Sequence, residues 1–375
     1  NIVICGMTKI LTDAFSIARI NQTNLVRSWR QGKRSLGVDS MIGSNFLTAR
    51  AITQIIGLPS AMDVDTFVDG RVHMAEFLLP ENSPLENQSI EEINAAGNFE
   101  ELNVMAVFSE TEEEMEFKFP RGGTIVSPSD RILVAGGMKA IHRFSQMITP
   151  DKQNGDSGEV VVLGGGEVGF QVSRILEDTN YTVRLIEHDE KRARTLAEEL
   201  PSTLVLNHDA EDSEFLLEEH LDEANVVVAA LGNDESNLLV SLLSKQLGAN
   251  RAVSVVKNQK YIDLFEQVGL DAAINPRLLT AEEITRYTRA DGTENVALLK
   301  SEHAEVLEFE IDRDSPIADR EIQSITDDLP REVVFGAIIR DDDFILPWGK
   351  VVIKLGDHVL LLVAADKAAE LQEQI

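Results

Sequence analysis

Short apolar runs alternate with amphipathic stretches between residues 159 and 256. Runs rich in β-branched residues predict buried parallel strands, and they fall at residues 159–163, 181–186, 203–206, 225–231 and 252–256. Residues 170–176, after the first run, have the apolar spacing of a helix. Polar residues cluster behind the strands, at the sheet edge where ligands bind in open α/β folds. The pattern therefore predicts an α/β domain with a ligand site.

A glycine-rich loop follows the first predicted strand and matches the spacing of a nucleotide-binding turn. Gly164 permits a tight turn, Gly166 lets backbone amides approach a phosphate, and Gly169 lets the helix pack closely on the sheet. Glu187 lies 18 residues beyond Gly169, at the end of the second strand. An acid there accepts hydrogen bonds from ribose hydroxyls and repels a 2′-phosphate, which disfavours NADP. The alternative is a glycine turn kept only for packing.

Other polar residues behind the strands have two interpretations each. Asp209 either reaches an adenosine or caps a helix; Asn233 and Asp234 either face the ligand or form a helix N-terminus. Lys257 either meets a phosphate or is a solvated strand-end lysine. The candidate nucleotide-binding residues are Gly164, Gly165, Gly166, Glu167, Val168, Gly169, Glu187, His188, Asp209, Ala210, Gly232, Asn233, Asp234 and Lys257.

The chain also repeats itself. Residues 37–42, 47–52 and 83–85 recur at an offset of 232, residues 1–11 recur at 236, and Pro120 and Asp130 recur at 227. Offsets this similar over so many elements indicate a tandem duplication. The first half has no counterpart of residues 159–236, so we expect about 80 residues to precede Asn1.

The repeat and a polar, Gly- and Pro-containing stretch predict the domain bounds. They are a truncated first N-terminal domain at 1–60, a first C-terminal domain at 61–149, a linker at 150–158, a complete second N-terminal domain at 159–291 and a second C-terminal domain at 292–375. The N-terminal domains are expected to be Rossmann-like parallel sheets, and the C-terminal domains small α+β units.

Charge narrows the function. The 375 residues carry 64 Asp and Glu against 34 Lys and Arg, a net charge of −30, so nonspecific binding to nucleic acid is disfavoured. The excess fits a halophilic protein that works in concentrated salt, or an ordinary acidic cytosolic one. No apolar run approaches the length of a membrane helix, and the lone Cys5 allows no internal disulfide, which indicates a reducing compartment.

The motifs together resemble the RCK (KTN) domain family. The glycine loop, Glu187 and residues 234–237 resemble its N-terminal half, and residues 292–375 and 71–136 resemble its C-terminal companion twice. Two such units in tandem resemble the TrkA family of regulatory proteins of Trk potassium-uptake systems. There are two departures from its pattern. Leu231 stands where Thr is frequent, and Lys257 stands where Arg is common, although Arg19 keeps the Arg in the first half.

The resemblance implies a non-enzymatic, cytoplasmic regulatory subunit, peripheral to the inner face of the membrane. It would form a homo-oligomeric ring, as a dimer or tetramer, against a Trk-type membrane potassium transporter. Its regulatory ligand would be NAD(H) or ATP/ADP, bound by Gly164, Gly166, Gly169 and Glu187 and lined by Asp209, Asn233 and Asp234. The residues alone leave open which nucleotide is the signal, the sign of gating and the number of subunits.

Two other function classes compete with this interpretation. An NAD-dependent dehydrogenase needs a proton donor near the nicotinamide, but the seven histidines share no motif and none has metal-ligand spacing. We therefore expect neither catalytic nor metal-binding residues. A transcriptional regulator needs a basic recognition helix, which the sequence does not show.

A basic segment of the first half suggests a further contact. Arg27, Arg30, Lys33 and Arg34 either contact the transporter or anionic lipid, or pair with acids of a neighbouring subunit. Trp348 and Phe344, near Pro347, are expected to fill the core of the second C-terminal domain.

Overall fold

The chain divides into two compact units, each built from both halves of the sequence. The computed structural model describes residues 1–21, 25–26, 28–29, 37–58, 60–95, 101–110, 115–149, 157–285, 293–298, 304–326, 328–329 and 332–375. The first unit combines residues 1–57 with 154–284, and the second combines residues 58–153 with 285–375. The elements of the predicted N-terminal domains thus lie together in one unit, and those of the predicted C-terminal domains lie together in the other.

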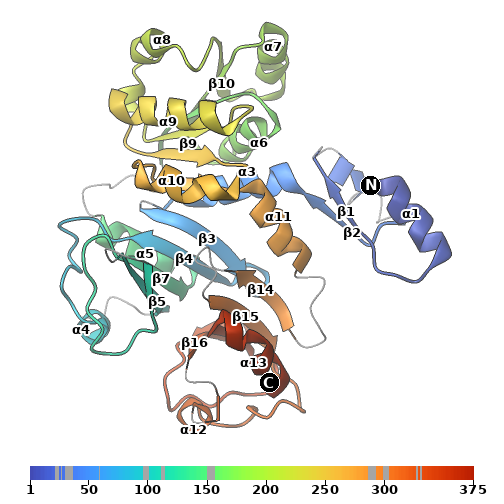
Figure 1. Ribbon diagram of the computed structural model, residues 1–375, viewed down its shortest axis with the longest axis vertical. Helices are drawn as coiled ribbons and strands as arrows, with labels where there is room; N and C mark the ends of the chain where they lie inside the picture. Colours follow the sequence, from blue (N-terminus) through green and yellow to red (C-terminus); the bar gives the residue numbers. More distant parts are fainter. Residues whose placement is uncertain are drawn as a thin grey trace. The chain divides into compact units, whose positions relative to one another are not determined.

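The first unit contains the predicted parallel sheet (Figure 1). Its six strands run in the order β10-β9-β8-β11-β12-β13, and every neighbouring pair is parallel. The strands are β8 (Ser157–Leu163), β9 (Asn180–Glu187), β10 (Thr203–Asn207), β11 (Val226–Ala229), β12 (Ala252–Val255) and β13 (Ala272–Ile274). The five predicted strands are confirmed. β8 begins two residues inside the predicted linker, and the rest of that linker, 150–156, lies outside the described residues.

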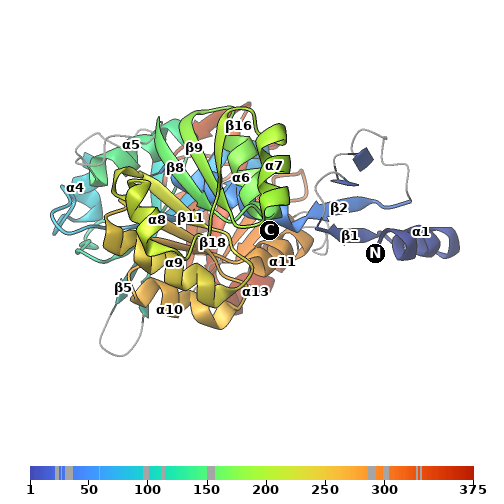
Figure 2. The same cartoon turned by 90° about the horizontal axis from the view of Figure 1, so that it is seen from above.

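Helices cover both faces of this sheet. The chain moves from β8 toward β10 on one side and from β11 toward β13 on the other, so right-handed crossovers place α6 and α7 opposite α9 and α10 (Figure 2). The helices are α6 (Glu167–Leu176), α7 (Glu190–Glu199), α8 (Ser213–Glu218), α9 (Asp234–Leu247), α10 (Ile262–Gln267) and α11 (Pro276–Thr285). Val161, Leu163 and Val227 of the sheet pack with Val240 of α9 in a common core.

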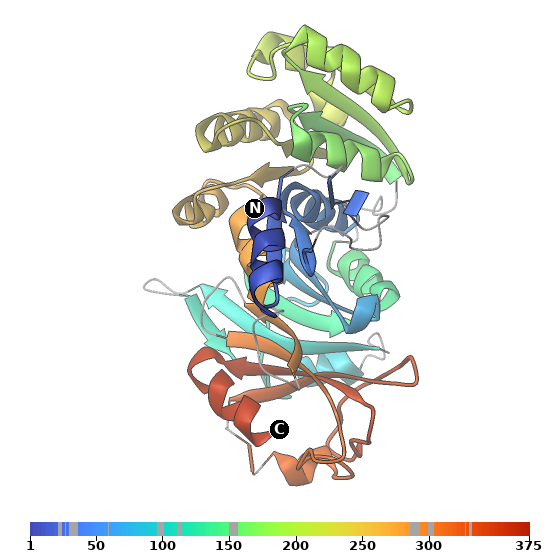
Figure 3. The same cartoon turned by 90° about the vertical axis from the view of Figure 1, so that its right-hand side faces the viewer.

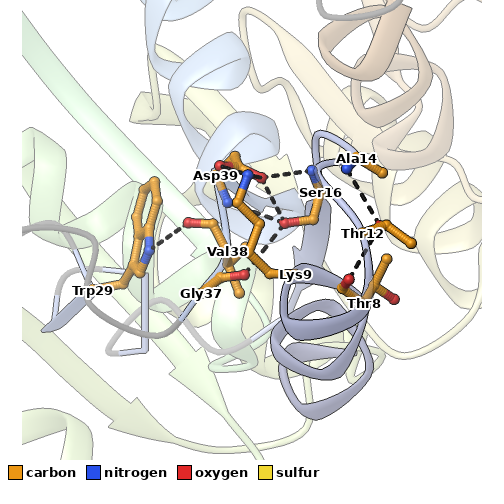
Figure 4. Close-up of polar contacts among 9 residues, drawn as sticks. All are labelled: Thr8, Lys9, Thr12, Ala14, Ser16, Trp29, Gly37, Val38 and Asp39. Atoms are coloured by element: carbon orange, nitrogen blue, oxygen red, sulfur yellow. Dashed lines mark hydrogen bonds and ion pairs between the residues drawn. The ribbon is translucent and has the colours of Figure 1, made fainter.

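The first-half segment of this unit corresponds to the stretch of the second half from α9 to α11. It contains α1 (Ile2–Leu11), β1 (Ile17–Ile20), β2 (Ser40–Gly43) and α3 (Ser44–Ile56). β1 pairs with β2 in parallel, as β12 pairs with β13, and the register pairs correspond at the offsets of the repeat. Asp39 joins the pieces: it accepts hydrogen bonds from the Ser16 backbone N–H at 2.8 Å and from Lys9 Nζ at 3.0 Å (Figure 4). The Ser16 bond and then the Lys9 bond lower the pKa of Asp39.

Helix α3 attaches the first half to the second. It packs against α6 and buries Ile52 and Ile55 completely. Arg251, directly before β12, is buried and donates from one terminal nitrogen to the Ile55 carbonyl at 2.8 Å. Burial lowers the pKa of Arg251 to about 10, and the charge of Asp271 offsets part of that shift. A helix from one repeat is therefore held by the sheet of the other.

The second unit holds two copies of one small domain. The first copy has β3 (Ala61–Phe67), β4 (Val72–Leu78), α4 (Ile90–Ala95), β5 (Leu102–Glu110), β6 (Met115–Lys118), β7 (Arg131–Gly136) and α5 (Met138–Ile148). The second copy has β14 (Thr293–Leu298), β15 (Ala304–Glu310), α12 (Ile322–Ile325), β16 (Val333–Arg340), β17 (Asp343–Ile345), β18 (His358–Ala364) and α13 (Ala368–Gln374).

The two copies confirm the duplication. Their sheets have matching orders, β3-β4-β7-β5-β6 and β14-β15-β18-β16-β17. Register shifts also recur, between residues 61 and 63 in the first copy and between 293 and 295 in the second. The sheets lie one above the other (Figure 3), and residues such as Met105 and Leu360 share one buried core. Phe344 packs against this core as expected, but Trp348 is 58% exposed, so its predicted burial is wrong.

Candidate functional site

The glycine loop links β8 to α6 at the point where the strand order reverses. Gly164 has φ +108°, and a Cβ there would lie 2.7 Å from the Ala230 carbonyl oxygen at the end of β11. A Cβ on Gly169 would lie 2.0 Å from the Gly164 carbonyl oxygen. These positions require glycine for the turn and for the close approach of the helix, as the spacing predicted. The crevice between β8 and β11 is where open α/β sheets bind ligands.

Gly166 lies at the N-cap of α6, where an anion meets the positive end of the helix. The first backbone N–H groups of a helix have no partner inside it, and the helix dipole attracts negative charge. The nearest heavy atom to a Cβ built on Gly166 is the Ala230 carbonyl oxygen at 4.0 Å, so the position is open. The predicted Glu167 and Val168 form the first turn of α6 behind it. This terminus is suited to a phosphate group.

Glu187 closes the loop from the end of β9. Its carboxylate is buried, and one oxygen accepts the Gly165 N–H at 2.8 Å. The other oxygen accepts the Asp189 N–H at 2.8 Å and lies 3.0 Å from Nδ1 of His188, whose side chain is exposed. Glu187, the acid expected at the ribose, is thus fixed beside the glycine loop. Its carboxylate oxygens can still accept a hydrogen bond from a hydroxyl.

The remaining predicted residues lie behind the neighbouring strands. Asp209 and Ala210 follow β10, and the Asp209 carboxylate accepts the Glu211 N–H at 2.9 Å. Gly232 follows β11, and its carbonyl accepts a hydrogen bond from Lys257 Nζ, behind β12. Because all these strands are parallel, their carboxyl ends share one edge of the sheet with the glycine loop.

Asn233 and Asp234 both have structural partners. Asn233 caps α9, and its side-chain oxygen accepts the Ser236 N–H at 2.8 Å. Asp234 is buried, and its carboxylate accepts the Lys257 and Asn258 N–H groups at 2.8 and 2.9 Å. The structure therefore gives these two residues the helix-terminus role, and a direct contact between them and a ligand stays a prediction.

Three residues near the edge were not among the candidate nucleotide-binding residues. Arg192 of α7 donates through Nε to the Gly165 carbonyl at 2.9 Å. Asn207 donates to the backbone oxygens of Glu187 and His188, joining the ends of β9 and β10. Asn237 is fully buried and links the Leu231 N–H to the Val255 carbonyl, both at 2.7 Å. Of the three, only Asn237 could have been found from the sequence, because Asn1 occupies the same position in the first repeat.

Expectations from the sequence also concerned metal binding, membrane spans and a basic cluster. In the described part of the chain, no group of three or more His, Cys, Asp or Glu is arranged to hold a metal ion. None of the described helices is both long and apolar enough to span a bilayer. The basic cluster of Arg27, Arg30, Lys33 and Arg34 lies outside the described residues.

Comparisons with known proteins agree with this architecture. The TrkA-N domain family matches residues 160–276, and the TrkA-C domain family matches residues 74–149 and 306–375. A Trk system potassium uptake protein TrkA homolog of Archaeoglobus fulgidus is 30% identical over 338 residues, which cover 90% of this chain and 74% of the relative. TrkA homolog 2 of Methanosarcina mazei is 28% identical over 381 residues, covering 100% of this chain and 83% of the relative.

Solved structures share the fold. The GsuK RCK domain superposes with a TM-score of 0.53 at 15% identity, covering 100% of this chain and 77% of that chain. The GsuK channel bound to NAD superposes with a TM-score of 0.53, also at 15% identity, over 100% of this chain and 64% of that one. At this identity the likeness shows the fold alone.

Proposed function

This chain belongs to the TrkA family of Trk-system potassium uptake proteins, and we propose that it is a nucleotide-sensing regulatory subunit of a potassium transporter. One observation carries the sensing part. The Gly165 N–H is bonded to a buried Glu187 carboxylate at the topological switch point, beside the open N-terminus of α6. The Glu187 carboxylate can accept a hydrogen bond from a ribose hydroxyl, and the N-terminus of α6 can bind a phosphate. The relatives' names, as potassium uptake proteins, support a non-enzymatic role.

Each part of a nucleotide has a place at this edge of the sheet. A phosphate accepts hydrogen bonds from the N–H groups at the start of α6, where the helix dipole favours an anion. A ribose hydroxyl donates to Glu187, whose fixed negative charge disfavours a 2′-phosphate. The adenine then extends toward Asp209 and Ala210, behind β10. These contacts serve NAD(H) and ATP or ADP alike, because all of them share an adenosine and a phosphate.

A series of contacts also connects the proposed site to the rest of the chain. Nucleotide binding at the loop acts on α6, and α6 packs against α3. Helix α3 ends at Ile56, directly before the second unit begins at Leu58. A ligand that binds two arrangements of α6 with different affinity shifts their populations and thereby the regulatory state. We place this protein in the cytoplasm, as a homo-oligomer against the inner face of the membrane where its Trk-type transporter lies.

Calorimetry with NAD, NADH, ADP and ATP in molar KCl tests the nucleotide site. We expect binding near one site per chain, and the ligand bound most tightly identifies the signal. Glu187→Ala should weaken it at least tenfold, because it removes the ribose acceptor and a bond to the loop. Glu190→Ala is the matched control, since it removes an exposed carboxylate three residues away. No binding of any of the four ligands to the unchanged protein would refute the sensing role.

The basic cluster is tested separately. Reversing the charges of Arg27, Arg30, Lys33 and Arg34 should abolish co-purification with the transporter if these residues contact it or its lipid. A changed oligomeric mass, with co-purification intact, would instead assign them to contacts between subunits.

A further inference from the structure

Arg192 has a place at the glycine loop that the proposed ligand contacts do not explain. Its Nε lies 2.9 Å from the Gly165 carbonyl oxygen, on the peptide group that joins Gly165 to Gly166. The chain contains no cis peptide bond among the described residues, so the carbonyl and the N–H of this peptide point in opposite directions. A contact that fixes the direction of the Gly165 carbonyl therefore also fixes the direction of the Gly166 N–H.

The same peptide would turn over easily without a restraint. Such a flip changes ψ of Gly165 and φ of Gly166, and glycine tolerates positive φ at almost no cost. A flipped peptide would direct the Gly165 carbonyl, with its negative end, toward the helix terminus where a phosphate is expected. The Glu187 bond does not prevent this, because it holds the preceding N–H and not the carbonyl.

Two further contacts place Arg192 beside the loop. Its backbone N–H donates to the capping carboxylate of Asp189 at 2.7 Å. Its guanidinium carbon lies 5.7 Å from the ring centroid of Phe170, a buried residue of α6. The side chain thus spans from the first turn of α7 to the loop and to the helix that follows it.

We propose that Arg192 is a positioning residue that locks the Gly165–Gly166 peptide with its N–H toward the phosphate-binding end of α6. The inference rests on the proposed nucleotide site and adds a residue to it. Arg192 acts through the loop, and its donor atom matters more than its charge. Substitutions can separate these properties, because Gln carries a nitrogen at the same number of bonds from Cα as the Arg Nε, while Met has that length and no donor.

The experiment measures ADP affinity by calorimetry in the full chain and in three variants. Arg192→Met should weaken ADP binding at least tenfold, and Arg192→Gln should stay within about threefold of the unchanged protein. Arg194→Met is the matched control, because Arg194 lies on the same helix, is 76% exposed and carries the same charge. Melting curves show that each variant is folded. Equal losses in Arg192→Met and Arg192→Gln would mean a direct charge contact with phosphate, and no loss in Arg192→Met would mean no role; either result overturns the inference.

A second readout needs no ligand. In protein labelled with ¹⁵N-glycine, the amide resonance of Gly166 should move in Arg192→Met and stay close to its original position in Arg192→Gln and Arg194→Met. If the unchanged protein binds no ADP, the proposed site fails, while these spectra still decide whether Arg192 orients the peptide. A Gly166 resonance unmoved in Arg192→Met overturns the inference.

Discussion

Residues 1–57 and their repeat counterpart, which begins at α9 in the second half, keep the same polar contacts but bury their helices differently. Asn1 donates to the Arg19 carbonyl at 2.7 Å, and Asn237 donates to the Val255 carbonyl at the same distance. The bond from Lys9 to Asp39 likewise recurs at 3.0 Å, between Lys245 and Asp271. These bonds join a helix, a strand and the following loop within one stretch of chain, so each repeat forms them alone.

Burial does not repeat in this way. Val240 of α9 is fully buried, whereas its counterpart Ile4 in α1 is 68% exposed. No residue of α1 is buried, although the helix is more apolar than most surface helices. Strands β11 and β12 pack against α9, whereas among the described residues α1 contacts β1, the counterpart of β12, and no counterpart of β11. The polar contacts thus form within one short stretch of chain, whereas burial of the apolar helix residues requires neighbouring strands of the sheet.

The largest expected difference is in the free energy of unfolding between variants of the two corresponding asparagines, Asn237 and Asn1. Asn237→Ala leaves the part-buried Leu231 N–H and the buried Val255 carbonyl without their partner and should cost about 3 kcal/mol of unfolding free energy. Asn1→Ala, at an exposed bond, should cost under about 0.5 kcal/mol. Urea unfolding followed by Trp29 fluorescence in a Trp348→Phe background reports the first unit, since each unit holds one tryptophan. Equal costs would contradict the comparison.

The next largest difference in stability is expected between variants of the corresponding apolar residues Val240 and Ile4. Val240→Ala removes two methyl groups from a filled core and should destabilise the first unit by about 2 kcal/mol. Ile4→Ala should change its stability by less than about 0.5 kcal/mol and lower the binding of a hydrophobic dye, because Ile4 contributes to an exposed apolar face. Denaturation and dye fluorescence check both, and a large cost at Ile4 would show that α1 is covered in solution.

Salt should act mainly on the acidic majority of the chain. Residues 1–60 contain two acids against seven Lys and Arg, and the excess of acids lies beyond them. Raising KCl from about 0.1 to about 2 M shortens the screening length severalfold, so the melting temperature should rise as repulsion among carboxylates falls. An unchanged or lower melting temperature would argue against adaptation to concentrated salt.

The smallest effect concerns Asp39 and pH. Its pKa is lowered in the folded chain by the Ser16 N–H and then by Lys9. A carboxylate of this kind stabilises the fold above its unfolded pKa of about 3.9, and the contribution disappears as the pH falls through the lower, folded value. Trp29 emission should therefore shift as the pH falls below about 4, and Asp39→Asn should remove that part of the titration. Persistence of the whole transition in Asp39→Asn would exclude Asp39 as its source.

Local patterns predicted much of the fold and part of the site. The runs at 159–163 and 181–186 became β8 and β9 because strands buried on both faces need continuous apolar sequence. Gly164 and Gly169 were identifiable because only glycine fits their backbone positions. Trp348 was misplaced, since an apolar residue near a turn is buried only if another element covers it. Arg192 was missed because its contact with Gly165 spans 27 residues and leaves no periodic signal.

The sequence by itself determined the parallel strands, the glycine loop and the duplication, because these depend on residue spacing along one stretch of chain. Only the tertiary structure decided that residues 1–57 fold with 154–284 and residues 58–153 with 285–375. That pairing depends on the fit between surfaces far apart in the chain: Ile52 and Ile55 of α3 find their burial against α6, and Arg251 binds the end of α3. An apolar helix face favours burial, and only the three-dimensional packing determines whether and by which element it is covered.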